Sequence, residues 1–216
     1  MASTQPSLRP SPPQPIPAAE TAEQRAAPRL TLLLRQAKLR TRGGEFLCVI
    51  RDVSETGLSI RTFHPLPPDK RLAIELREDW PFQLEKVWEK DGEAGFRFRD
   101  PVDLDELLAE DARFPKRQIR IRMEMSLTVQ GQVERAPATI SNLSQQGACI
   151  ASDATFARDE LVKLETPLLP AIHAKIRWRK DDIHGLVFEE TFGFRDFACL
   201  LASLQGLGDR PACRPR

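Results

Sequence analysis

The chain has 216 residues, of which 41% are hydrophobic and 29% charged, so most of it can bury a core. Its 32 basic and 31 acidic side chains leave a formal net charge of +1, which argues against a non-specific nucleic-acid binder because such proteins carry a strongly basic face. The sequence lacks the run of roughly 18 apolar residues that a membrane-spanning helix needs, and its Pro-rich start does not resemble a signal peptide. We therefore expect a cytoplasmic protein without membrane insertion.

Both ends of the chain are predicted to be unstructured. Residues 1–24 hold six prolines among Ser, Gln and Ala, and such a segment buries too little apolar surface to offset the entropy lost on ordering. Residues 1–24 are therefore predicted to be a disordered tail, and residues 206–216 a flexible C-terminus.

Residues 25–111 contain short runs in which apolar positions alternate, separated by turn signals such as Gly43-Gly44 and Asp91-Gly92. The predicted strands are Leu32–Leu39, Glu45–Val53, Gly57–Phe63, Arg71–Leu76, Phe82–Glu89 and Ala94–Phe98. A helical spacing of leucines follows in Asp103–Glu110.

The same pattern returns in residues 112–205. Asn142 lies 90 positions after Asp52, and the same offset relates Trp178 to Trp88. The offset of 90 holds without a gap from Asp52 to Phe98, which is hard to produce by chance. The sequence therefore indicates two copies of one fold. The second set of predicted strands is Arg120–Val129, Ala138–Leu143, Gly147–Ala151, Leu161–Glu165, Ala171–Arg179 and His184–Phe188, followed by a helix in Phe192–Leu204.

Six short antiparallel strands in about 90 residues favour a small closed barrel, because closure removes exposed sheet edges. The predicted fold class is all-β, with two tandem six-stranded antiparallel barrels, each followed by a C-terminal α-helix.

Two short motifs flank the strands of the first copy. Arg25 and Arg29 precede the first strand as RxxxR, and Asp52, Ser54 and Gly57 follow the second strand as DxSxxG. Here the sequence resembles the PilZ family, whose signatures are RxxxR and [D/N]xSxxG, and it matches both without substitution. The resemblance implies a receptor for cyclic di-GMP, in which the arginines lie on a mobile segment that wraps over ligand held against the barrel.

The second copy carries the second signature as Asn142, Ser144 and Gly147. Its basic element has two possible alignments. Lys116 and Arg120 form KxxxR, with Arg120 22 positions before the motif, close to the 23 positions of the first copy.

The alternative alignment is Arg113 with Arg117, a formal RxxxR that lies 25 positions upstream of the motif. We prefer Arg120 on spacing, and keep Arg117 as a possible replacement for the first arginine.

These residue types suit a ligand with two guanine bases and two phosphate charges. A guanidinium can form a bidentate bond with guanine or phosphate and can stack on a purine, whereas lysine is a point charge. An Asp or Asn oxygen can accept from the N–H edge of guanine, the Ser hydroxyl adds a donor or acceptor, and Gly permits close backbone approach.

Other chemistry is not supported by the sequence. The three histidines have no metal-ligand spacing and the four cysteines form no CxxC pair, so we expect neither a metal nor a cofactor. Neither motif serine has a repeated His partner, so an enzyme is not expected. Trp88 and Trp178 are assigned to packing in the core or at the barrel rim rather than to stacking on a base.

The predicted function is a cyclic di-GMP receptor that changes shape on binding and acts on an unidentified protein partner, without nucleic acid. One alternative is a ligand-free adaptor that acts through protein contacts. A nucleic-acid-binding barrel is disfavoured by the near-neutral charge and by an aromatic content of 6%.

Overall fold

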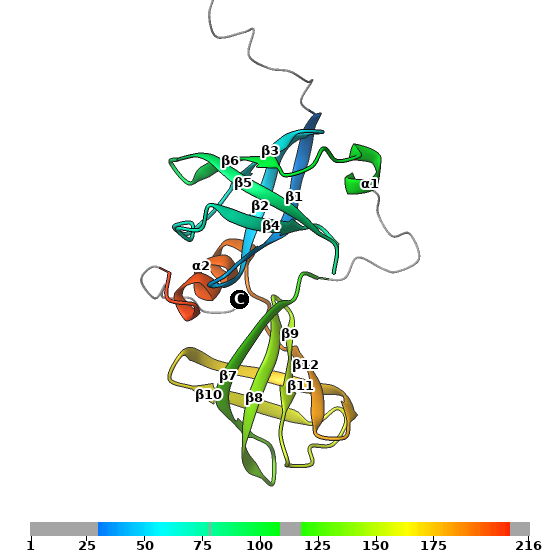
Figure 1. The fold of residues 1–216 in the computed structure, drawn as a ribbon. Helices are drawn as coiled ribbons and strands as arrows, with labels where there is room; N and C mark the ends of the chain where they lie inside the picture. Colours follow the sequence, from blue (N-terminus) through cyan, green and yellow to red (C-terminus); the bar gives the residue numbers. More distant parts are fainter. Residues whose placement is uncertain (1–29, 78, 109–117, 208–216) are drawn as a thin grey trace, which may run out of the picture.

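The computed structural model describes residues 30–77, 79–108 and 118–207, which form two closed six-stranded antiparallel barrels. The predicted fold class is confirmed. In Figure 1 the barrels lie one above the other, with helix α2 (Phe194–Leu204) between them. The predicted tail, residues 1–24, lies outside the described residues, and only Gly206 and Leu207 of the predicted C-terminal stretch are described.

Barrel 1 closes in the strand order β1-β2-β3-β6-β5-β4, with β4 paired back to β1. The β5–β6 hairpin turns at Asp91-Gly92, where φ angles of 52° and 76° are typical of a two-residue turn that matches the strand twist. The strands are β1 (Leu30–Thr41), β2 (Gly44–Ser54), β3 (Gly57–Arg61), β4 (Arg71–Glu75), β5 (Pro81–Lys90) and β6 (Glu93–Phe98).

Barrel 2 repeats this topology, since its order β7-β8-β9-β12-β11-β10 matches that of barrel 1 strand for strand. Each barrel is filled by the inward side chains of alternating strands, as in β7, where Met125, Leu127 and Val129 are buried. The strands are β7 (Ile121–Gln130), β8 (Arg135–Ser144), β9 (Gly147–Ala151), β10 (Leu161–Thr166), β11 (Leu169–Lys180) and β12 (Ile183–Phe188).

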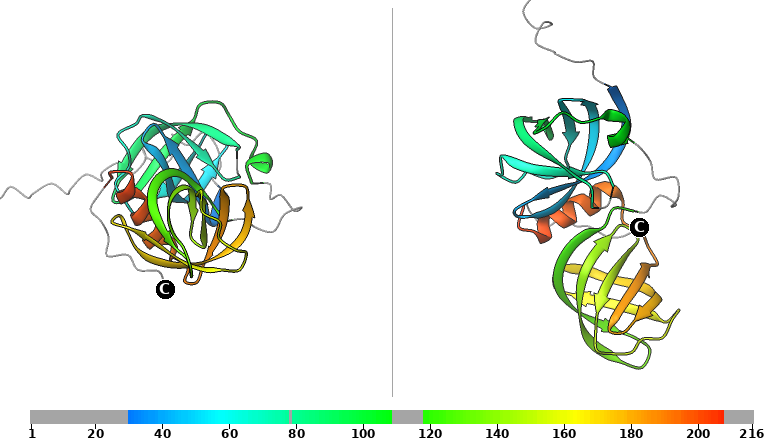
Figure 2. Two further views of the ribbon diagram at one scale, coloured as in Figure 1. Left: turned by 90° about the horizontal axis from the view of Figure 1, so that it is seen from below. Right: turned by 45° about the vertical axis from the view of Figure 1, so that its right-hand side comes forward.

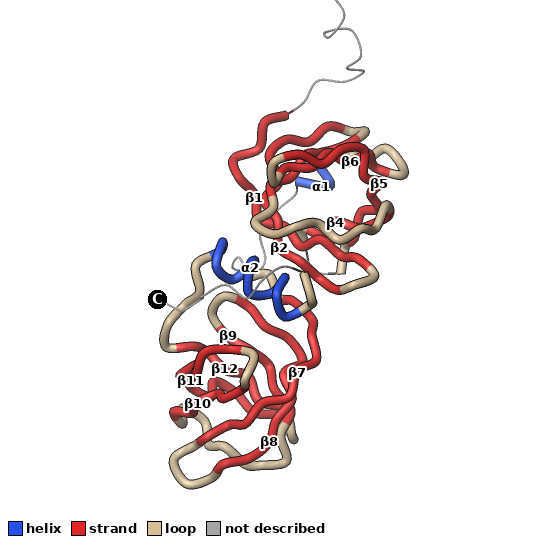
Figure 3. Tube along the Cα trace, turned by 90° about the vertical axis from the view of Figure 1, so that its left-hand side faces the viewer, coloured by secondary structure: helices blue, strands red, loops and turns tan. Residues whose placement is uncertain are grey.

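A helix follows each barrel, but the two helices differ. Helix α1 (Leu104–Leu108) has five residues, whereas α2 has eleven and lies between the barrels, as Figures 2 and 3 show from other directions. Phe197 and Leu201 of α2 join the core of barrel 2, and Ala202 joins that of barrel 1. None of the helices in the described ranges is long and apolar enough to cross a membrane.

Candidate functional site

The DxSxxG motif of barrel 1 forms the end of the β2–β3 hairpin. Ser54 Oγ donates a hydrogen bond to the carbonyl of Gly57, 3.2 Å away, and so braces the turn. A Cβ at Gly57 would overlap the carbonyl oxygen of Phe96 on β6, which explains the glycine. Asp52 accepts a 2.6 Å bond at Oδ2 from Ser59 Oγ, so its carboxylate lies on the same strand pair as the braced turn.

Barrel 2 reproduces this local structure. Ser144 Oγ donates to the carbonyl of Gly147 at 3.0 Å, and a Cβ at Gly147 would overlap the carbonyl oxygen of Leu186. In both copies the motif serine and glycine therefore shape the hairpin. The first motif residue, Asp52 or Asn142, does not brace the turn; it lies on the strand before it, beside the paired residue of the next strand.

The basic elements lie largely beyond the part of the chain that the structure describes. Arg25 and Arg29 of the first copy, and Lys116 and Arg117 of the second, fall outside the described residues. Arg120 is described: it is exposed, directly precedes β7, and its carbonyl accepts a bond from Lys38 Nζ at 3.4 Å.

The strand register explains why the basic elements stand 23 and 22 positions before their motifs. In barrel 1, Thr31 pairs with Asp52, and in barrel 2, Arg122 pairs with Asn142. The first strand of each barrel, β1 or β7, has a β-bulge directly after this pair. In β1 the bulge separates Thr31 from Arg35, four positions later, whereas in β7 it separates Arg122 from Met125, three positions later, although the partner strands advance by two positions in both cases.

The extra residue in the β1 bulge accounts for the one-position difference. Arg29 lies two residues before the partner of Asp52, and Arg120 lies two residues before the partner of Asn142. This equivalence favours the alignment of Lys116 with Arg25 and of Arg120 with Arg29.

The structure adds one residue per barrel to the candidate site, and sequence reasoning had placed it elsewhere. Trp88 and Trp178 are 42% and 48% exposed, so of the two predicted placements, core or barrel rim, the core is wrong. Each ring lies over a cross-strand glycine, Gly95 or Gly185, where a Cβ would overlap the indole.

Each tryptophan lies in one row with its motif residue. In barrel 2, the paired positions run from Trp178 through Gly185 and Cys149 to Asn142. Three strand spacings place the ends of this row about 14 Å apart, with only small side chains between them.

The row of barrel 1 has the same composition, with Trp88, Gly95 and Ser59 leading to Asp52. The signal that could have identified these tryptophans is the repetition of a Trp with a Gly seven positions later at the same offset of 90. Each barrel thus has an outer face with an aromatic ring at one end and a hydrogen-bonding side chain at the other.

Two small closed barrels of identical strand order, each with this braced hairpin, define the class as a tandem small-barrel protein. The family model described as PilZ domain matches residues 23–114 and again residues 110–202. The chain therefore belongs to the PilZ family.

Several solved structures are similar to this chain at low identity and low TM-score. PlzA of Borreliella burgdorferi, solved in complex with c-di-GMP, is 12% identical over 77% of this chain and 85% of its own, with a TM-score of 0.33. MrkH of K. pneumonia in its c-di-GMP complex is 12% identical over 79% and 85%, with a TM-score of 0.31. YcgR of Escherichia coli with c-di-GMP is 10% identical over 71% and 74%, with a TM-score of 0.27. A search of curated proteins finds no match.

Proposed function

We propose that this protein is a cyclic di-GMP receptor with one binding site on the outer face of each barrel. The observation that carries the proposal is the repeated row of Asp52 or Asn142, two small residues and an exposed tryptophan, next to the strand that the basic element enters. PilZ membership supports it, since the [D/N]xSxxG signature of the family begins at the motif residue of this row and the RxxxR signature precedes the adjacent strand in the sequence.

The row suits a purine nucleotide. An Asp or Asn oxygen can accept hydrogen bonds from guanine, and an exposed indole packed against a glycine offers an apolar surface on which a base can stack. The arginines would supply charge and planar forks for the phosphates or for the second base. No catalytic step is required of any of these groups.

The two sites differ in the basic element that serves them. The first site has Arg25 and Arg29, whereas the second has Lys116 and Arg120 in the same register, with Arg117 as a possible substitute for the first arginine. Since lysine lacks the planar fork, the first site is expected to bind more tightly. The second basic element lies between the two barrels in the sequence, so ligand bound there would also change how the barrels are arranged.

Isothermal titration of the whole chain with cyclic di-GMP tests the proposal. Asp52→Ala should weaken one binding step by about 1.5–3 kcal/mol, the contribution of a hydrogen bond that involves a charged partner, and Asn142→Ala should weaken the other by about 0.5–1.5 kcal/mol, because its amide is neutral. Asp153→Ala is a suitable control, because Asp153 is exposed beyond the far end of β9. Absence of binding heat and of a thermal shift at high ligand concentration would favour a ligand-free adaptor instead.

A further inference from the structure

A residue outside both signatures lies in the row of the second site. Arg122 on β7 is the direct partner of Asn142 on β8. Directly paired residues point to the same face of a sheet with Cβ atoms about 5 Å apart, so the Arg122 side chain begins beside Asn142. The side chain is 55% exposed.

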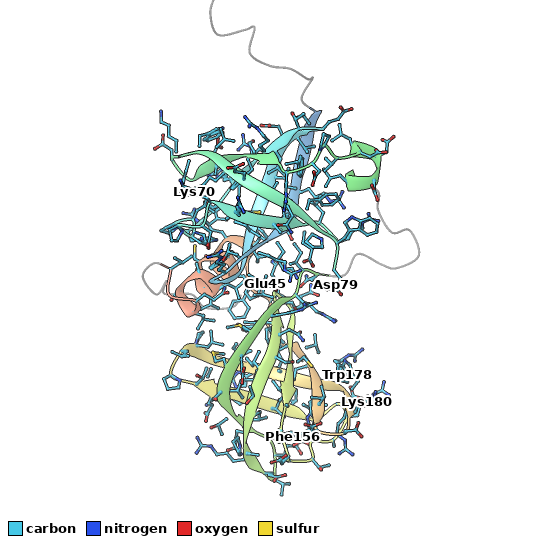
Figure 4. The ribbon with its side chains drawn as sticks, in the orientation of Figure 1. Glu45, Lys70, Asp79, Phe156, Trp178 and Lys180 are labelled. Carbon is cyan, nitrogen blue, oxygen red and sulfur yellow. The ribbon has the colours of Figure 1, made fainter. Side chains whose placement is uncertain are left out.

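The side chain of Arg122 forms an ion pair with a residue of barrel 1. Nη2 of Arg122 lies 2.6 Å from Oδ1 of Asp79, which follows β4 in barrel 1. This hydrogen bond and the charge of Asp79 raise the pKa of Arg122. Figure 4 shows Asp79 at the level where the two barrels meet.

Barrel 1 also holds the backbone around Arg122. The Arg122 amide donates to Glu45 Oε2 at 2.8 Å, and Lys38 Nζ contacts the carbonyl of Arg120 at 3.4 Å. Lys38 is buried and lies 2.9 Å from Glu75 Oε1 and 3.4 Å from Glu45 Oε2. The start of β7 is therefore anchored to a buried ion cluster, whereas the Arg122 side chain takes part in an exposed ion pair.

The buried ion cluster and the exposed Arg122–Asp79 pair differ in how readily a ligand anion can replace one of the partners. A buried pair is costly to break because a charge would be left without a partner. An exposed pair contributes little, so another anion can take the place of Asp79 at small cost. A phosphate oxygen is a strong acceptor for a guanidinium and can form the same geometry as a carboxylate.

We propose that Arg122 is a ligand-binding residue of the second site, and that Asp79 of barrel 1 is the anion with which the ligand phosphate competes. The inference rests on the proposed function. Arg122 supplies the planar fork that Lys116 cannot, and barrel 1 has Thr31 at the equivalent register. Occupation of the second site would then remove one contact between the barrels while the buried cluster stays in place.

The test is a titration of the full chain with cyclic di-GMP in an Asp52→Ala background, so that binding reports the second site. Asp79→Asn retains a residue that tolerates the positive φ of 61° at this position. It should bind about two- to fivefold more tightly, because a competing charge is removed. Arg122→Ala should bind about tenfold more weakly.

The combination of the two substitutions separates competition from a general loss of negative charge. In the Arg122→Ala background, Asp79→Asn should leave the affinity unchanged if Asp79 acts only by holding Arg122. Glu165→Gln is a matched control, since it removes a carboxylate that pairs with Lys163 at 2.6 Å and with Arg135 at 3.1 Å elsewhere on barrel 2. This control should leave the affinity unchanged as well.

The outcomes distinguish this inference from the proposed function. If Asn142→Ala weakens binding but Arg122→Ala and Asp79→Asn do not alter it, the role of Arg122 is overturned while the receptor function stands. If the unmodified chain shows no binding, the proposed function fails and the inference fails with it. Circular dichroism checks folding, and Arg122→Lys serves as a second variant that keeps the charge but loses the fork and should bind more weakly.

Discussion

At the scale of single residues, His184 is a histidine buried inside barrel 2 rather than exposed to solvent. It points into barrel 2 with its side chain fully buried, and the ring of Phe156 packs edge-on against it at 5.6 Å. Nδ1 lies 3.1 Å from the carbonyl of Asp182, so the proton of the neutral ring lies on Nδ1. Nε2 is buried and has no hydrogen-bond partner among the residues that the structure describes. Burial lowers the pKa of His184 because the charged form would be poorly solvated.

The lowered pKa predicts a loss of stability in acid. Between the pKa of folded His184 and the unfolded value near 6.5, the unfolded chain binds a proton that the folded chain does not, so the free energy of unfolding falls as pH decreases through this window. His184→Leu should remove this part of the pH dependence. Urea denaturation between pH 7.5 and 5 measures it, with His173→Leu at an exposed position of β11 as the control. An unchanged slope in His184→Leu would contradict the assignment.

Single residues also show where prediction from sequence ends. Strict alternation along β11 places Trp178 on the same face as the buried Ala174 and Ile176. A bulge between Ile176 and Trp178 inserts one residue and reverses the direction of the side chains that follow. The motif residues could be recognised because their spacing survives in the sequence, whereas a bulge leaves no comparable pattern. The exposure of the tryptophan could therefore not be predicted.

At the scale of elements, α2 was predictable as a helix but not in its placement. The spacing of Phe197, Leu201 and Leu204 indicates an apolar stripe. An apolar stripe does not determine which surfaces the helix will cover. In the structure α2 contacts both barrels. Its end is fixed by Gln205, whose Oε1 accepts from the amide of Glu45 at 2.9 Å and whose Nε2 donates to the Glu45 carbonyl at 2.8 Å.

Gln205→Ala should destabilise the protein by about 1–3 kcal/mol, because it leaves the amide and carbonyl of the buried residue Glu45 without these partners. The measurement is equilibrium unfolding in urea. Ser203→Ala is the control on the same helix, since no side-chain hydrogen bond is described for Ser203, and it should have a much smaller effect. Equal effects of the two substitutions would show that the contact with Glu45 contributes little.

At the scale of the whole molecule, the duplication predicts two barrels but not how they meet. The interface combines apolar and polar contacts. Phe63 of barrel 1 packs edge-on against Phe194 of α2 at 5.9 Å, and its carbonyl accepts from Cys199 Sγ at 3.1 Å. Leu47 of barrel 1 belongs to the core cluster of barrel 2. These partners come from different copies, so the 90-residue repeat, which relates equivalent positions, contains no information about them.

This interface makes the response of the molecule to ligand testable. If ligand at the second site draws in the segment before β7 and displaces Asp79 from Arg122, the barrels should change their arrangement, and small-angle scattering should record a change in overall dimensions at saturation with cyclic di-GMP. At a ligand concentration that just saturates the second site of the unmodified chain, the change should persist in Asp52→Ala, which affects the first site, and be reduced in Asn142→Ala, which weakens binding to the second. Identical scattering with and without bound ligand would count against the shape change. A change of unreduced size in Asn142→Ala would instead assign it to the first site.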